Sequence, residues 1–222
     1  MKIPPLHDWP ETAEAAIELQ QTLRDRVITD DRYGPIHTVA GVDAAFEAEG
    51  TMTRAAVVVL SFPDLQVQEQ AIARRPTRFP YIPGFLSFRE VPAILDALAQ
   101  LSITPDLLLC DGQGIAHPRR FGIACHLGLL TDLPAIGVAK SRLVGTHGAV
   151  PDERGGWVPL EYRQEVVGAV LRSRVGTKPL YISPGHRISL PGAIEQVMAC
   201  TTRYRLPETT RLSDRLSKSR AV

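Results

Sequence analysis

Two aspartates interrupt apolar segments of the sequence at places where a carboxylate is costly. Asp43 lies in the middle of "VAGVDAAF", and Asp111 ends the run "LLLCD". Burying an unpaired carboxylate costs of the order of several kcal/mol, so two of them at comparable positions call for a shared partner. If the two strands are neighbours, the carboxylates converge, and repulsion raises their proton affinities unless a cation lies between them.

The chemistry of these side chains indicates which cation would fit. Carboxylate oxygens without a supporting cluster of histidine and cysteine favour Mg²⁺ or Mn²⁺ over zinc. A structural role stays open for Asp111, because "DGQG" is good turn chemistry at the end of a strand. Asp43 is harder to explain in that way, since aspartate is disfavoured in the middle of a strand and no turn signal touches it.

Four further polar residues could contribute, and each also has an ordinary structural explanation. Glu90 closes the segment Ser87-Phe88-Arg89-Glu90, which matches a capping box with Ser87 as the N-cap. Asp214 would by default be a solvated residue of a terminal helix. Lys140 follows a buried strand and could simply extend to solvent. His117, in "GIAHPRRFG", could lie beside a phosphate or a metal, or be exposed.

The segment "RFPYIPGFLSFRE", residues 78–90, carries four aromatic residues in a stiff loop. Pro80 and Pro83 fix φ on either side of Tyr81 and Ile82, and Gly84 frees the backbone just after them. The pattern predicts apolar side chains at the tip of a rigid loop, followed at once by a helix. From the sequence alone, such a loop most simply packs as a satellite of the core.

The first half of the sequence predicts a helix followed by an antiparallel meander. From Pro10 onward, Ala16, Leu19, Leu23 and Val27 share one helical face. Three strand-like segments follow with short turns between them, at residues 37–46, 54–61 and 65–73. After the proline-rich loop, we expect a helix over residues 87–101.

The second half alternates buried strands with helices. "DLLLCD" and "PAIGVAK" are short apolar runs typical of strands that are buried on both faces. Residues 119–130 predict the helix between them, "EVVGAVLRS" and "KPLYIS" predict a hairpin, and Ser189 can cap a helix that runs to about Tyr204. The pattern predicts an α/β fold with a mixed central β-sheet flanked by helices.

Length and composition place further bounds on the protein. The 222 residues suit a single domain over residues 1–222, and 44% hydrophobic and 22% charged residues are ordinary for a globular protein. A net charge of +1 leaves any basic surface to be local. Three unclustered cysteines fit a reducing compartment, and we find no apolar leader or membrane span. We expect a cytoplasmic protein that does not bind membranes.

Several segments together resemble the endonuclease V family of deoxyinosine-directed repair nucleases, in the order that the family has them. They cover most of the chain from about Arg24 to Leu216 and are "GVDAAF", "PYIPGFLSFRE", "DGQGIAHPRRFGIACHLG", "IGVAKSRLVG", "PLYISPGHRISL" and "TRYRLPETTRLSD". The resemblance implies a ribonuclease H-like fold, which agrees with the mixed sheet predicted above.

The resemblance also implies roles for individual residues. Asp43, Glu90 and Asp111 fall on the metal-binding catalytic acids of the family, and Asp214 falls on a fourth active-site position. A wedge that separates the strands is implied for Tyr81, Ile82 and Pro83. The positions implied to lie near the base pocket or the bound backbone are Gly84, Leu86, Gly112, His117, Ile123 and Lys140. A local basic track is expected from Arg119, Arg120, Lys140 and Arg142.

The implied function is a metal-dependent DNA repair endonuclease that recognises deoxyinosine, or deaminated adenine, by base flipping. It would hydrolyse the second phosphodiester bond 3′ to the lesion and leave a 3′-hydroxyl and a 5′-phosphate. We expect Mg²⁺ as cofactor, with Mn²⁺ as a substitute, and a monomer that binds inosine-containing DNA. Two alternatives stay open: a ribonuclease directed at inosine-containing RNA, and a non-catalytic binder of altered nucleic acid.

Overall fold

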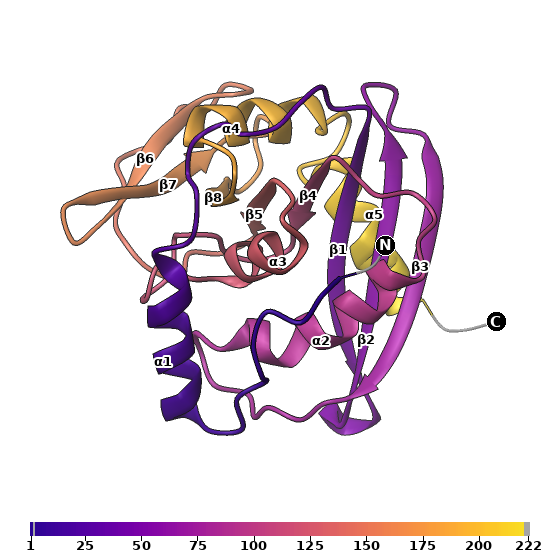
Figure 1. Cartoon of the computed structure of the whole chain (residues 1–222). Coiled ribbons are helices and arrows are strands. Elements are labelled where there is room, and N and C mark those ends of the chain that lie inside the picture. Colours follow the sequence, from indigo (N-terminus) through magenta and orange to yellow (C-terminus); the bar gives the residue numbers. More distant parts are fainter. Residues whose placement is uncertain (2, 220–222) are drawn as a thin grey trace.

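The computed structural model describes Met1 and residues 3–219, and its strands form one eight-stranded sheet (Figure 1). The strand order is β3-β2-β1-β4-β5-β8-β7-β6. The β1–β4 and β4–β5 pairs are parallel, and the other pairs are antiparallel. The strands are β1 (Thr38–Glu47), β2 (Met52–Ser61), β3 (Val67–Pro76), β4 (Leu107–Cys110), β5 (Ala135–Ala139), β6 (Trp157–Tyr162), β7 (Glu165–Leu171) and β8 (Leu180–His186).

Helices cover both faces of this sheet. They are α1 (Ala13–Arg24), α2 (Leu86–Ala99), α3 (Ile123–Thr131), α4 (Leu190–Ala199) and α5 (Glu208–Lys218), with a short 3₁₀ turn at Ala48–Gly50. Side chains of α2 and α3 share one core with alternate residues of β1 and β4, and those of α4 and α5 share the other. Because neighbouring strand residues point to opposite faces, both central strands are buried. The predicted mixed α/β sheet is confirmed.

The predicted antiparallel meander is confirmed by the pairing of β1 with β2 and of β2 with β3. The predicted hairpin is confirmed as β7 and β8, but the sequence did not reveal β6 as its further partner. Val27 was expected on the first helix, yet that helix ends at Arg24. Val27 still packs beside Leu23 in a small apolar cluster beyond the helix end.

Two helix boundaries differ from the expected ones. The helix predicted from Arg119 begins at Ile123, because Arg120 has a positive φ of 58° and Gly122 is the N-cap. Ser189 caps α4 as predicted, and its hydroxyl accepts a hydrogen bond from the Gly192 amide. That helix ends at Ala199, five residues before Tyr204.

The capping box predicted at the start of α2 is wrong. Phe85 is the N-cap, without a side-chain hydrogen bond, and Ser87 lies inside the helix with its hydroxyl buried and unpartnered. The preceding loop closes through a hydrogen bond from the Phe85 amide to the Ile82 carbonyl, so the helix starts at Leu86. Glu90 therefore has no capping role, and its buried carboxyl needs another explanation.

A glycine on β1 allows α5 to approach the sheet closely. A Cβ atom at Gly41 would lie 2.0 Å from the Thr209 carbonyl oxygen and 2.9 Å from the Thr210 amide nitrogen. Gly41 and Asp43 are two residues apart and therefore face the same side of the sheet. The small residue thus brings the helix that carries Asp214 onto the strand that carries Asp43.

We predict that Gly41→Ala lowers the free energy of unfolding by about 3 kcal/mol, because α5 must move away from β1 or the strand must bend. Urea denaturation checks this change. Gly148→Ala is the matched control, since no atom lies within 4 Å of a Cβ built there. Equal stability of the two variants would show that α5 adapts to the methyl group without cost.

The described residues contain no helix that is long and apolar enough to cross a membrane. Cys110, Cys125 and Cys200 are all free and buried. The absence of a disulfide framework among them agrees with the prediction from their spacing.

Candidate active site

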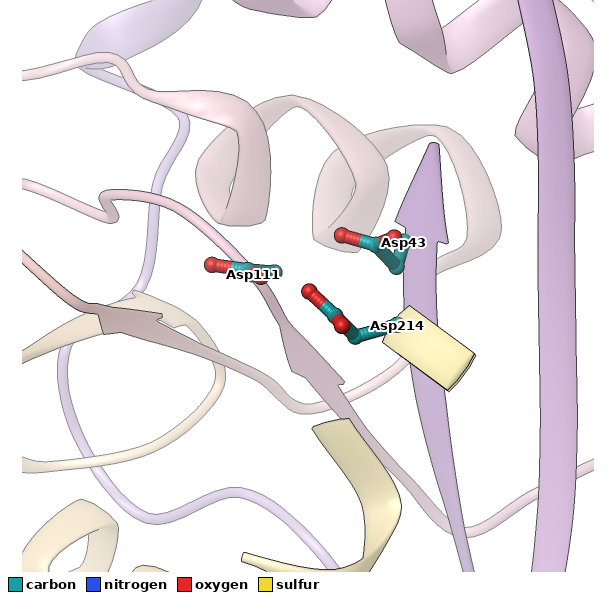
Figure 2. A group of neighbouring side chains, drawn as sticks. All are labelled: Asp43, Asp111 and Asp214. Carbon is teal, nitrogen blue, oxygen red and sulfur yellow. The ribbon is translucent and has the colours of Figure 1, made fainter. Parts of the chain in front are cut away.

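Three aspartates, from β1, the end of β4 and α5, converge beside the central strands of the sheet (Figure 2). Val42 of β1 pairs with Cys110 of β4 in parallel register. The next residues, Asp43 within β1 and Asp111 just after β4, therefore lie side by side. Asp214 reaches them from α5. One carboxylate oxygen of each residue lies within 4.8 Å of the others. We call Asp43, Asp111 and Asp214 the acid cluster.

Two lysines contact the acid cluster and offset part of its charge. Lys140, which follows β5, places its Nζ 2.5 Å from Asp111 Oδ2 and 2.6 Å from Asp214 Oδ1. Lys218 lies one turn beyond Asp214 on α5 and contacts the same Oδ1 atom at 2.7 Å. Arg205 donates to the Lys140 carbonyl oxygen at 3.1 Å and helps to fix the backbone there. Lys140 therefore does not simply extend to solvent.

The carboxyl groups differ in their affinity for protons. Burial, together with the charges of Asp111 and Asp214, raises the pKa of Asp43 to about 7, although a hydrogen bond from Ser217 opposes this rise. Burial alone would raise the pKa of Asp214, but hydrogen bonds from Lys140 and Lys218 outweigh it and lower that pKa. The cluster thus combines an ionised carboxylate with one that retains a proton close to neutral pH.

Glu90 is buried beside the acid cluster but is not one of its three members. It comes from α2, which packs on the opposite face of the sheet from α5. Burial, and then the charges of Asp43 and Asp111, raise the pKa of Glu90 well above its ordinary value. The family resemblance implies that Glu90 binds the metal with Asp43 and Asp111, which stays a prediction. The carboxylate that lies within 4.8 Å of those of Asp43 and Asp111 is that of Asp214.

A cavity of about 370 Å³ opens next to the acid cluster. Asp111 and Lys140 belong both to its wall and to the charged contacts described above. All nine residues that were assigned to nucleic-acid binding line it, namely Tyr81, Ile82, Pro83, Gly84, Leu86, Gly112, His117, Ile123 and Lys140. A Cβ atom at Gly112 would lie 2.6 Å from Ile123 Cγ2, so this wall has no room for a further side chain.

The proline-rich loop divides its aromatic residues between two environments. Phe79, Phe85 and Phe88 are buried and pack against one another, with ring centroids 5.4–6.3 Å apart. Tyr81 is 74% exposed at the tip of the loop, at the mouth of the cavity. Packing against the core therefore explains the three phenylalanines, whereas Tyr81 is left exposed, and its role as a wedge stays a prediction. We call residues 80–83 the wedge loop.

The carbonyl oxygen of Gly84 anchors the end of the wedge loop. It accepts hydrogen bonds from Gln20 Nε2 at 3.1 Å, His117 Nε2 at 2.9 Å and Arg119 Nη2 at 2.9 Å. Burial, and then the charge of Arg119, lower the pKa of His117 to about 4, so its ring is neutral at neutral pH. Its Nδ1 accepts from the Arg119 amide, which leaves the proton on Nε2.

Sequence reasoning missed Gln20. This residue is buried on α1, four residues after Ala16 and three before Leu23, and a polar residue on an apolar face was the available signal. Arg119 donates to the Gly84 carbonyl oxygen, and Arg120 pairs with Glu165 at 2.6 Å. The basic track expected from these arginines stays a prediction.

Comparison with known proteins decides the family. A sequence profile of endonuclease V matches residues 21–215. The chain belongs to the endonuclease V family. An endonuclease V of Nostoc sp. is 62% identical over 221 residues, a match that covers 99% of this chain and 100% of the relative. Family membership makes the protein a nuclease with a role in DNA repair.

Solved endonuclease V structures share the fold. The enzyme of Streptomyces avermitilis superposes with a TM-score of 0.90 at 45% identity, covering 97% of this chain and 95% of that one. Endonuclease V of Ciona intestinalis has a TM-score of 0.80 at 27% identity, covering 94% of this chain and 97% of that one. The Ciona structure holds a 24-mer DNA that contains an inosine followed by a ribo-adenosine. The ribonuclease H-like fold is therefore confirmed.

We predict that Asp43→Asn becomes progressively more stable than the wild type as the pH rises, when both are measured in EDTA. The pKa of about 7 in the folded protein exceeds the ordinary value of 3.8, so the folded state holds this proton more tightly than the unfolded chain. Stability is then lost between about pH 4 and pH 7, by a few kcal/mol at most. Asparagine cannot ionise and avoids this loss.

Urea denaturation at several pH values measures the difference. Asp64→Asn, at an exposed turn residue, serves as the control and should track the wild type at every pH. A constant difference between Asp43→Asn and the wild type across this range would contradict the assigned proton affinity.

Proposed function

We propose that the chain is a metal-dependent endonuclease that flips deoxyinosine into the cavity and cleaves the DNA strand at the acid cluster. The observation that carries this proposal is that the wedge loop, the cavity and the acid cluster adjoin one another. The wedge loop forms the mouth of the cavity, and Asp111 and Lys140 join the cavity to the acid cluster. A base held in the cavity would thus place its own strand beside the reacting groups.

The donor set fits a divalent metal ion. Its ligands would be hard carboxylate oxygens, and the pKa of Asp43 is raised by burial and then by the negative charges of Asp111 and Asp214. Asp43 and Asp111 would bind the ion with Asp214 close by, and Glu90 would act directly or through water. Mg²⁺ is the proposed ion, with Mn²⁺ as a substitute. Such an ion supplies positive charge that stabilises the phosphate as it is attacked.

The residues of the cavity suit a flat, uncharged base. Gly112, Leu86 and Ile123 form a close apolar wall, and hypoxanthine would fit where the additional amino group of guanine is crowded out. The backbone of Gly84 was expected to meet the base, but its carbonyl oxygen is engaged by three protein donors. Gly84 would therefore shape the cavity rather than read the base.

Base flipping would depend on the wedge loop. Unstacking a base costs a few kcal/mol, and an inserted apolar side chain offsets part of that cost by filling the vacated space. Tyr81 is exposed where such insertion requires it, on a loop whose foot is buried. The cut is proposed one nucleotide beyond the lesion, at the second phosphodiester on its 3′ side, leaving a 3′-hydroxyl and a 5′-phosphate.

An inosine-directed ribonuclease is the second candidate, and the Ciona complex favours keeping it. The DNA in that structure carries a ribo-adenosine directly after the inosine. Digestion of matched inosine-containing DNA and RNA strands would separate the two candidates. The third alternative, a non-catalytic binder, is not supported, because the family consists of nucleases and Asp43, Asp111 and Asp214 are assembled. A cytoplasmic, monomeric, single-domain enzyme is part of the same proposal.

We predict that cleavage of inosine-containing DNA requires a divalent cation and that Asp43→Ala and Asp111→Ala each abolish it. Both variants remove a carboxylate from the acid cluster but leave the wedge loop and the apolar wall of the cavity unchanged, so substrate binding should persist. Cleavage assays in Mg²⁺, Mn²⁺ and EDTA, together with gel-shift binding, check both statements. Asp64→Ala is the control. Either cluster variant cleaving at the rate of the wild type would refute the site.

We predict that Tyr81→Ala slows cleavage of inosine in a duplex far more than in a single strand. Stacking by an aromatic side chain is worth roughly 1–3 kcal/mol per base, so the duplex rate should fall about tenfold or more. A single strand has less stacking to break. Single-turnover cleavage of one labelled strand, alone and annealed, measures both losses. Equal losses would mean that Tyr81 serves general binding and not strand separation.

A further inference from the structure

The last turn of α5 brings a buried hydroxyl to the acid cluster. Ser217 is 1% exposed, and its Oγ lies 2.5 Å from Asp43 Oδ2. The same Oγ lies 3.0 Å from the carbonyl oxygen of Asp214. A hydroxyl has one proton to donate, and a short hydrogen bond to an ionised carboxylate is stronger than one to a neutral carbonyl group. The contact with Asp43 is therefore the dominant one when Asp43 is ionised.

This contact constrains the orientation of Asp43. Among the side chains of the acid cluster, Asp43 is the one that accepts a hydrogen bond from Ser217, and no lysine in the described part of the chain pairs with it. A hydrogen bond at Oδ2 also holds the carboxylate plane and leaves the second oxygen available for a cation. Groups that bond to the ligands of a metal in this way are commonly worth 10–100-fold in metal affinity or activity, as an order of magnitude.

Helical spacing explains how one helix provides both a member of the cluster and this donor. Asp214 and Ser217 are three residues apart, so they lie on the same face of α5. That face is held against β1 by the close approach at Gly41.

We propose that Ser217 is a positioning residue that holds the carboxylate of Asp43 oriented for the metal, and that it thereby sets the affinity for the divalent ion. This inference rests on the proposed function, because it takes Asp43 as a metal ligand. Ser217 would not touch the substrate or the reacting phosphate. Its effect should therefore be visible in metal binding by the protein alone, without DNA.

The experiment titrates Mn²⁺ into the metal-free full-length protein and follows free Mn²⁺ by electron paramagnetic resonance. Ser217→Ala should bind Mn²⁺ about tenfold more weakly than the wild type, and Ser217→Thr, which keeps the hydroxyl, should stay within about threefold. Ser213→Ala is the matched control: its hydroxyl is equally buried on α5 but donates only to the Thr210 carbonyl oxygen. Its affinity should equal that of the wild type.

Asp43→Asn in the same titration separates the role of Ser217 from the existence of the metal site. Weak binding by Asp43→Asn with unchanged binding by Ser217→Ala would overturn the role of Ser217 and leave the proposed function intact. Unchanged binding by Asp43→Asn would overturn the metal site itself. Equal losses in Ser213→Ala and Ser217→Ala, or in Ser217→Thr and Ser217→Ala, would also overturn the inference, since helix packing would then explain the effect.

Discussion

Repulsion between carboxylates is the constraint on which the arrangement of this protein depends. Two unit charges 4.8 Å apart, the limit of separation within the acid cluster, repel by about 3 kcal/mol at the effective dielectric typical of proteins. Glu90 adds a fourth carboxyl group nearby, and this group is buried. A flexible surface would relieve this repulsion by separating the groups. Here Asp43 and Asp111 are fixed to adjacent central strands, which are covered on both faces and cannot move apart independently.

The surrounding groups offset that repulsion only in part. Lys140 and Lys218 both approach Asp214, and Lys140 also pairs with Asp111, whereas Asp43 has the hydroxyl of Ser217 as its donor. The result is an uneven cluster in which Asp43 keeps its proton up to about neutral pH. A metal ion binding there must displace this proton, so ion binding and pH are coupled. The carboxylate repulsion that the lysines do not offset lowers the stability of the metal-free protein. The same repulsion would favour the binding of a cation.

The sequence revealed those parts of the site that depend on one strand at a time. A carboxylate within an apolar strand, as at Asp43, or at its end, as at Asp111, is visible as a local conflict between burial and charge. The contribution of Asp214 could not be read in this way, because it depends on how closely α5 packs on Gly41. Glu90 shows the opposite error: its spacing from Ser87 fits a local cap, but the loop before α2 starts the helix at Leu86.

The proline-rich loop has a buried part and an exposed part. Core packing and a strand-separating wedge, the two interpretations of its sequence, therefore do not exclude each other. A wedge must resist the load of separating stacked bases, a few kcal/mol, and an exposed aromatic tip alone would give way. In the proposed role, that resistance would come from the buried foot of Phe79, Phe85 and Phe88 and from the donors that hold the Gly84 carbonyl oxygen. Those donors lie on α1 and on the segment before α3, so distant parts of the chain fix the loop.

The same loop leads directly into α2, which carries Glu90 to the acid cluster six residues after Gly84. The wedge and one of the acids therefore belong to a single continuous element, joined by a helix turn whose amide and carbonyl groups are hydrogen bonded. A displacement of the wedge loop would be transmitted to Glu90 instead of being absorbed by a flexible linker. In the proposed function, this continuity would hold the loop that engages the lesion in a fixed spatial relation to Glu90.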